Sequence, residues 1–188
     1  MKKISIVIIL LLLLLIACAT AIKSPEQTSQ ETKVSFDPYA GLYMVLGKKM
    51  NFGLSAFPNI TEFYLQGGFD KFGKTEFYQL YVYHWCQTGW KFLHSASDIT
   101  AIPLNVTILN RQVDFKATTT EEVAVDLPFD YLIKKKDIGL NIRILGDKGS
   151  ITIEVPPAYI QGFLHKFNEA KRMYLNKESE ITLDNKKG

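Results

Sequence analysis

EFYQLYVYHWC, residues Glu76–Cys86, is the longest strand-like run in the sequence. Aromatic and β-branched residues favour strands, and here they occupy both alternating faces, with Gln79 as the main polar interruption. A strand that is apolar on both faces usually lies centrally or beneath another layer. The sequence therefore predicts a β-sheet with this run at its centre.

The residues after this run predict a largely antiparallel fold. Gln87-Thr88-Gly89 reads as a turn, and residues 90–94 are expected to pair back on the run as a hairpin. A polar loop with glycines at both ends, residues 146–149, predicts a second hairpin. Shorter strand-like runs are Glu62–Gln66 (ended by Gly67-Gly68), Ser97–Ile102, Leu104–Leu109, Gln112–Lys116, Glu122–Leu127, Tyr131–Lys134, Leu140–Leu145 and Ile151–Val155. Their even spacing predicts an antiparallel β-sandwich or a partly closed barrel.

The end of the chain has a different period. Pro156-Pro157 ends the last strand, and a proline suits the first turn of a helix. Apolar residues then recur at helical spacing, at Ile160, Phe163, Leu164, Phe167, Ala170 and Tyr174. The pattern predicts an amphipathic helix of about 18 residues that packs on the sheet. A helix that lies in a membrane surface is the alternative.

The N-terminus begins with Lys2 and Lys3, continues with an aliphatic run and ends that run on Leu15-Ile16-Ala17-Cys18. A positive start, an apolar core and small residues at its exit are typical of a secretory signal peptide. The tetrapeptide resembles the lipobox of bacterial lipoproteins. An uncleaved membrane anchor is the alternative, because residues 4–22 are long enough to span a bilayer.

The lipobox resemblance implies that the signal is cleaved before Cys18 and that Cys18 carries a diacylglycerol and an acylated amino group. It implies a lipid-anchored location in the bacterial envelope, on the periplasmic face of the outer membrane if the cell is Gram-negative. The expected organisation is a signal peptide at 1–17, the lipidated cysteine and a flexible tether at 18–35, one β-rich domain with its helix at 36–175, and a polar tail at 176–188.

Composition argues against nucleic acid as a partner. Cleavage before Cys18 removes two lysines and no acid, so the formal charge falls from +3 to +1. A nucleic-acid-binding domain usually carries a basic stripe, and the run Lys134-Lys135-Lys136 is expected to be a solvated turn. Cys86 has no partner if Cys18 is acylated, and we expect it to be a buried packing residue.

The sequence contains no motif that predicts catalysis. His84 and Cys86 share one side of a strand, and His94 on the expected partner strand could approach them. No zinc-ligand spacing, nucleophile elbow or phosphate loop is present, however. We therefore expect no catalytic residue, no metal and no cofactor.

The aromatic residues of the central run are the candidate binding site. Tyr81, Tyr83, Trp85 and Trp90 are predicted to contact a ligand or partner if one sheet face is left uncovered. The expected function is a non-catalytic binding or structural role in the envelope, with the membrane as one partner and an envelope protein or apolar ligand as another. The alternatives are a carrier of lipid or another hydrophobic ligand in a barrel-like cavity, and a hydrolase with an unrecognised site.

Overall fold

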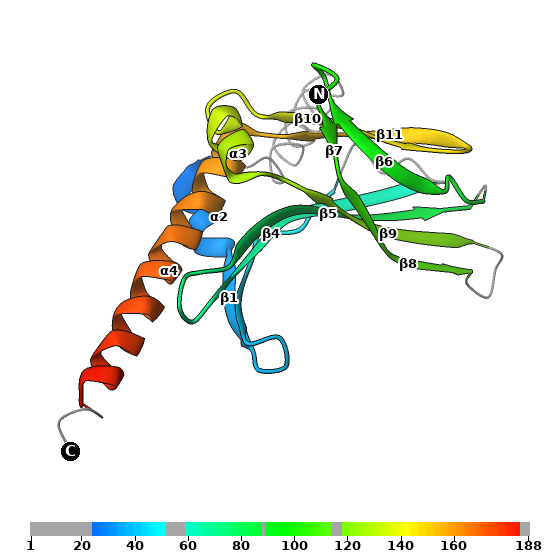
Figure 1. The fold of residues 1–188 in the computed structure, drawn as a ribbon. Coiled ribbons are helices and arrows are strands. Elements are labelled where there is room, and N and C mark those ends of the chain that lie inside the picture. The colour runs from blue at the N-terminus through cyan, green and yellow to red at the C-terminus, as the bar shows by residue number, and fades with distance from the viewer. Residues whose placement is uncertain (1–23, 52–58, 88, 114–117, 185–188) are drawn as a thin grey trace, which may run out of the picture.

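The computed structural model describes residues 24–51, 59–87, 89–113 and 118–184. Its strands form two antiparallel sheets, and a long C-terminal helix packs on them (Figure 1). The predicted mainly β sandwich with a C-terminal helix is therefore confirmed. The predicted signal peptide and lipobox lie outside the described residues.

The larger sheet carries the central run. Its strand order is β1-β2-β4-β5-β9-β8, and the short β3 also pairs with β4. The bounds are β1 Lys33–Asp37, β2 Leu42–Leu46, β3 Met50–Asn51, β4 Asn59–Asp70, β5 Glu76–Cys86, β8 Val106–Val113 and β9 Thr119–Asp126. The predicted central position of β5 is correct, because β4 and β9 flank it.

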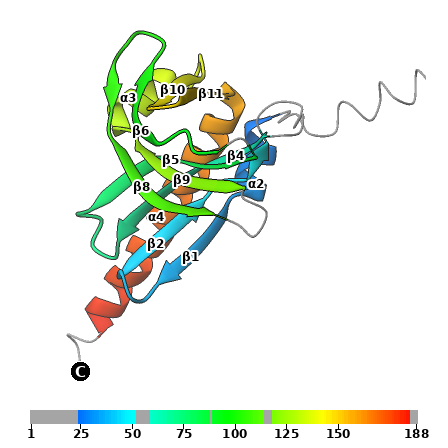
Figure 2. The same ribbon diagram turned by 90° about the vertical axis from the view of Figure 1, so that its right-hand side faces the viewer.

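The smaller sheet has the order β11-β10-β6-β7. Its strands are β6 Leu93–Asp98, β7 Pro103–Leu104, β10 Leu140–Gly146 and β11 Gly149–Val155. Figure 2 shows β6, β10 and β11 of this sheet above the strands of the larger sheet. The predicted hairpin of β10 and β11 is confirmed, and Gly146 pairs with Gly149 at its tip. Gly149 has a φ of 136°, which favours glycine at that position.

The predicted pairing of residues 90–94 with β5 is wrong. These residues leave the larger sheet, and β6 pairs with β10 and β7 in the smaller one. The backbone turns at Phe92, whose φ is 58°. Its amide and those of its two neighbours donate to the Glu121 carboxylate of β9. A buried carboxylate some 30 residues away therefore redirects the chain, and no local pattern reveals it.

The prediction that Gly67-Gly68 ends a strand is also wrong. β4 runs through both glycines, which pair with Tyr78 and Phe77 of β5. A Cβ at Gly67 would lie 2.9 Å from the Phe167 ring, and one at Gly68 would lie 2.6 Å from the Phe77 ring. The two glycines therefore admit aromatic rings close to the backbone on opposite faces of β4.

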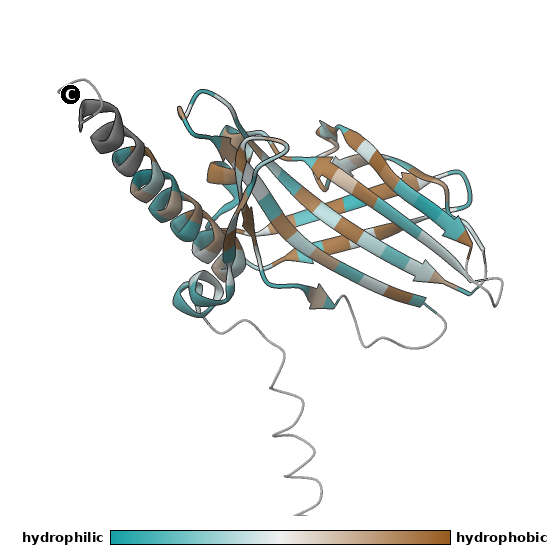
Figure 3. Cartoon of the chain, turned by 90° about the horizontal axis from the view of Figure 1, so that it is seen from below, coloured by the Kyte–Doolittle hydropathy of each residue, from teal (hydrophilic) through white to brown (hydrophobic). Residues whose placement is uncertain are grey.

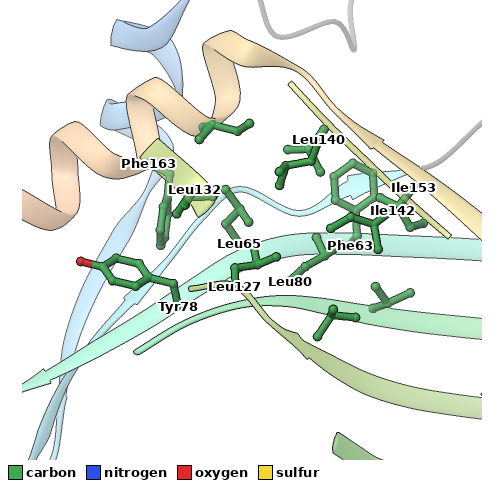
Figure 4. Close-up of a cluster of buried hydrophobic side chains, with 14 of the residues drawn as sticks. Phe63, Leu65, Tyr78, Leu80, Leu127, Leu132, Leu140, Ile142, Ile153 and Phe163 are labelled. Atoms are coloured by element: carbon green, nitrogen blue, oxygen red, sulfur yellow. The ribbon is translucent and has the colours of Figure 1, made fainter. Parts of the chain in front are cut away.

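One apolar core fills the space between the sheets and the helix. Side chains from β4 and β5 meet those of β10, β11 and the helices there (Figure 4). Fully buried members include Phe63, Leu65, Leu80, Leu132, Ile142, Ile153, Tyr159, Phe163 and Phe167. Tyr159 also donates its hydroxyl to the Lys48 carbonyl and accepts from the Leu65 amide. The helix therefore fastens the β2–β3 connection to β4.

The predicted tether is too long, because helix α2, Pro25–Glu31, forms inside it. Ser24 caps this helix by accepting from the Gln27 amide, and Pro25 takes its first turn. Thr28 is fully buried against the C-terminal helix. A Cβ at Gly162 of that helix would lie 2.2 Å from the Pro25 carbonyl oxygen. The folded domain therefore begins about ten residues earlier than predicted.

Residues predicted as the strand Tyr131–Lys134 form helix α3, Phe129–Lys135. The lysine run is likewise not a solvated turn, because Lys135 ends α3 and pairs with the buried Asp98 at 3.2 Å. Pro128 precedes the helix and acidic and basic residues lie at its N- and C-terminal ends, as the helix dipole favours. The short apolar run fits a strand or a helix. In the structure it is a helix, and its last residue, Lys135, pairs with Asp98.

The C-terminal helix α4 spans Pro157–Asp184 and is longer than predicted. Ala170 is the last buried residue among those of α4 whose burial is described, and the helix backbone continues into the expected polar tail. Beyond Ala170, Tyr174 stacks on Tyr43 with ring centroids 4.1 Å apart, and Lys171 pairs with Glu76 at 2.6 Å. No helix in the described part of the chain is both long and apolar enough to cross a membrane.

Candidate functional site

The outer face of the larger sheet, which points away from the smaller sheet, is the candidate site. Figure 3 looks onto this face, where hydrophilic and hydrophobic residues alternate along the strands and no described helix crosses them. Tyr81, Tyr83 and Trp85 occupy alternate positions of β5 and are partly exposed here. Trp90 lies beyond β5 in the connection to β6, where its ring contacts Phe92. The structure thus brings together three of the four predicted binding residues on one strand.

Cross-strand pairing adds residues that the sequence did not indicate. Tyr64 of β4 stacks on Tyr81, with ring centroids 4.5 Å apart. The Tyr81 hydroxyl donates to Glu122 of β9, and Asn110 of β8 donates to the other carboxylate oxygen at 3.1 Å. Burial, together with the bond to Glu122, raises the pKa of Tyr81. We call Tyr64, Tyr81, Tyr83, Trp85 and Glu122 the aromatic face.

A row of hydrogen-bonded polar side chains borders the aromatic face. Gln66 donates to the Gln79 side chain at 2.9 Å, and Gln79 donates to Asp126 at 2.9 Å. The three residues come from neighbouring strands β4, β5 and β9. Such cross-strand contacts fix side-chain positions before any ligand arrives.

A lysine-rich cleft adjoins the aromatic face at Tyr64. Its volume is about 420 Å³, and its lining includes Lys33, Lys48 and Lys49. Lys48 pairs with Glu31 of α2 at 2.9 Å. The face therefore combines ring surfaces and carboxylates at its centre with ammonium groups at one side.

A buried polar row lies on the opposite face of the same strands. Thr61, His84, Glu121 and Arg111 pair in register across β4, β5, β9 and β8. The Glu121 carboxylate accepts from the amides of Lys91, Phe92 and Leu93 at 2.6–3.1 Å. Arg111 Nε lies 3.4 Å from Glu121 Oε2, which makes an ion pair rather than a hydrogen bond of good geometry. This row holds residues 91–93 in place, where the chain passes from the larger sheet to the smaller one.

His84 belongs to this buried row and is only 2% exposed. Its Nδ1 lies 2.9 Å from Thr61 Oγ1, and its Nε2 has no hydrogen-bond partner among the described residues. Burial, aided by nearby Lys91 and opposed by Glu121, lowers the pKa of His84 to about 4. The ring is therefore neutral at physiological pH and closed to substrate.

The predicted approach of His94 to His84 and Cys86 is wrong. His84 and Cys86 share the buried face of β5, but the His94 side chain points outward and lies 3.1 Å from Asp147. Within the described ranges, no group of three or more His, Cys, Asp and Glu side chains is arranged to hold a metal ion. The prediction failed because it assumed that residues 90–94 pair with β5, whereas β6 pairs with β10.

Acidification is expected to destabilise the fold through His84. The unfolded chain takes up this proton near pH 6.5 and the folded chain near pH 4, so stability is lost as pH falls between these values. We expect about 2 kcal/mol less stability at pH 4.5 than at pH 7.5 from this residue. Urea unfolding of the wild type and His84→Gln at both pH values measures the difference.

The matched control is Thr61→Val, which removes the hydrogen-bond partner but keeps the titrating ring. Because burial is the main cause of the low pKa, this variant should retain the wild-type pH dependence. Equal pH dependence in the wild type and His84→Gln would contradict the prediction.

The site as described offers stacking surfaces, carboxylates and amides on an accessible sheet face. Such groups suit the binding of a ligand or partner. No family model, curated protein or solved structure matches the chain.

Proposed function

We propose that this protein is a lipid-anchored component of a bacterial envelope that binds a partner, without catalysis, through the aromatic face. The lipobox-like sequence ending at Cys18 supports the anchor and the compartment. The uncovered row of partly exposed rings on β4 and β5 supports binding. Aromatic residues are enriched at the centres of protein interfaces.

The Tyr64–Tyr81–Glu122–Asn110 network carries this proposal. A ring stack and two hydrogen bonds hold its side chains in place on the open face. Groups that are already ordered lose less conformational entropy when they bind. The matching partner surface presents apolar groups beside hydrogen-bond donors, since Glu122 and Asp126 are acceptors.

Photo-crosslinking in living cells tests both parts of the proposal. A benzophenone amino acid replaces Tyr83 or Trp85 in the full lipidated chain, and Ile108 serves as the control because it is 46% exposed on the opposite sheet face. We expect one adduct shared by positions 83 and 85, at several times the yield from position 108. Mass spectrometry identifies the adduct.

Two variants sharpen this experiment. Glu122→Gln should lower the adduct yield at position 83, because it weakens the bond that fixes Tyr81. Cys18→Ser should release the chain from membranes and remove an adduct that forms at the membrane. Equal yields at all three positions would contradict the binding face, and unchanged membrane fractionation of Cys18→Ser would contradict the anchor.

A further inference from the structure

The lipid anchor and the folded domain are separated by very little chain. Five residues, 19–23, lie between Cys18 and Ser24, the first described residue. A fully extended chain spans about 3.5 Å per residue, so Ser24 lies within about 20 Å of an acylated Cys18. This argument rests on the proposed anchor. The short distance from Cys18 to Ser24 places the surface around the start of α2 close to the lipid.

The start of α2 lies at one end of the domain. Pro25 lines a cleft together with Gln161 of α4. Gln161 in turn donates to Asp137 at 3.0 Å, in the connection between α3 and β10. Ile138 follows Asp137 and therefore lies next to the residue through which Gln161 links the two segments.

This end exposes apolar side chains to solvent. Ile138 is 71% exposed and Ile99, in the β6–β7 turn, is 74% exposed. Both line one cleft of about 530 Å³ together with Pro156 and Pro157. Large apolar side chains that gather at one exposed site usually mark a contact surface.

Asp98 links the β6–β7 turn, which carries Ile99, to α3, which precedes Ile138. This buried carboxylate accepts from the amides of Thr100 and Ile102, which shapes the β6–β7 turn, and pairs with Lys135 of α3. Burial opposes these contacts, but together they hold the pKa of Asp98 at about 2. The turn and the α3–β10 connection therefore form one unit that presents Ile99 and Ile138 together.

We infer that this end of the domain, with Ile99 and Ile138 at its tip, rests on the bilayer that holds the Cys18 lipid. The isoleucines insert at the boundary between headgroups and acyl chains, as apolar residues of membrane-surface proteins do. Figure 1 shows α3 and the β6–β7 turn on the opposite side of the molecule from the outer face of the larger sheet. In this orientation the aromatic face points away from the lipid and stays open to a partner.

The charges around the tip are mixed, because Lys135 and Glu154 line the same cleft as the isoleucines and Asp137 precedes Ile138. The contact therefore depends on apolar insertion rather than on lipid charge. We expect the same orientation in vesicles of phosphatidylcholine alone and of phosphatidylethanolamine with phosphatidylglycerol.

Quenching by lipid-borne nitroxides tests the orientation. The mature lipoprotein is reconstituted in both vesicle types with a fluorophore on Ile138→Cys or Ile99→Cys. Phe72→Cys and Tyr39→Cys are matched controls, because both side chains are exposed in turns of the larger sheet. The native Cys86 is only 2% exposed, so the fluorophore is directed to the introduced cysteine. Wild type without an introduced cysteine provides the blank. We expect quenching at 99 and 138 to exceed that at 39 and 72 at least threefold.

A second set of variants tests whether the isoleucines cause the contact. Ile99→Asn in the labelled Ile138→Cys chain should lower the quenching at least twofold, whereas Phe72→Asn should leave it unchanged. Equal quenching at all four labelled positions in an acylated protein overturns the inference and leaves the anchor intact. A chain whose residue 18 carries no lipid by mass spectrometry overturns the anchor and this orientation together.

Discussion

Replacing Glu121 by leucine is expected to lower the free energy of unfolding by about 3–5 kcal/mol. The substitution leaves three backbone amides, at Lys91, Phe92 and Leu93, without their acceptor and removes the anion beside Arg111. Glu121 is 1% exposed, so water cannot replace the lost contacts without opening the core. Urea unfolding followed by tryptophan fluorescence measures the loss.

Glu122→Leu is the matched control for this experiment. Glu122 is the next residue along β9, lies on the opposite face and is partly exposed. Its loss should cost about 1 kcal/mol, because water reaches the groups it binds. Similar losses in the two variants would show that Glu121 does not clamp the crossing between the sheets.

Gly162→Ala is expected to destabilise the protein by about 1–3 kcal/mol, the usual range for an overpacked contact. Helix propensity alone predicts the opposite sign, since alanine is favoured over glycine by about 1 kcal/mol inside a helix. The new Cβ would lie 2.2 Å from the Pro25 carbonyl oxygen and 2.5 Å from Thr28 Cβ, so α2 must move away from α4.

Limited proteolysis distinguishes this mechanism from a general loss of stability. Cleavage within Pro25–Glu31 should accelerate in Gly162→Ala while the sheets remain resistant. Asn168→Ala, at an exposed position of the same helix, is the control and should raise stability by a few tenths of a kcal/mol at most. A Gly162→Ala protein as stable as the Asn168→Ala protein would mean that α2 does not pack closely on α4.

The candidate site was predictable only within one strand. Tyr81, Tyr83 and Trp85 share a face because side chains alternate along any strand. Tyr64 and Glu122 join them only through the register of β4, β5 and β9. That register depends on contacts between residues distant in sequence, so no window around β5 contains it. Trp90 was misplaced for the same reason, because its predicted hairpin does not exist.

Local signals also account for the elements that sequence reasoning recovered and for one that it missed. The period of two in β5, the glycines between β10 and β11 and the helical period of α4 are each contained in a few consecutive residues. The cap Ser24-Pro25-Glu26 was equally local and indicates α2. The segment nevertheless predicts a flexible tether because it lacks aromatic residues, and the contacts that bury it come from α4 at Gly162.

The sequence by itself determined that this chain forms antiparallel strands with an amphipathic helix at their end, because periodicity and turn chemistry act over a few residues. Only the tertiary structure decided which strands pair, where the chain crosses between sheets and which face stays open. Those outcomes depend on single long-range contacts, such as the Glu121 carboxylate with the amides of residues 91–93 and Gly162 with Pro25. Such contacts are selected by the packing of the whole core, which no short stretch of sequence encodes.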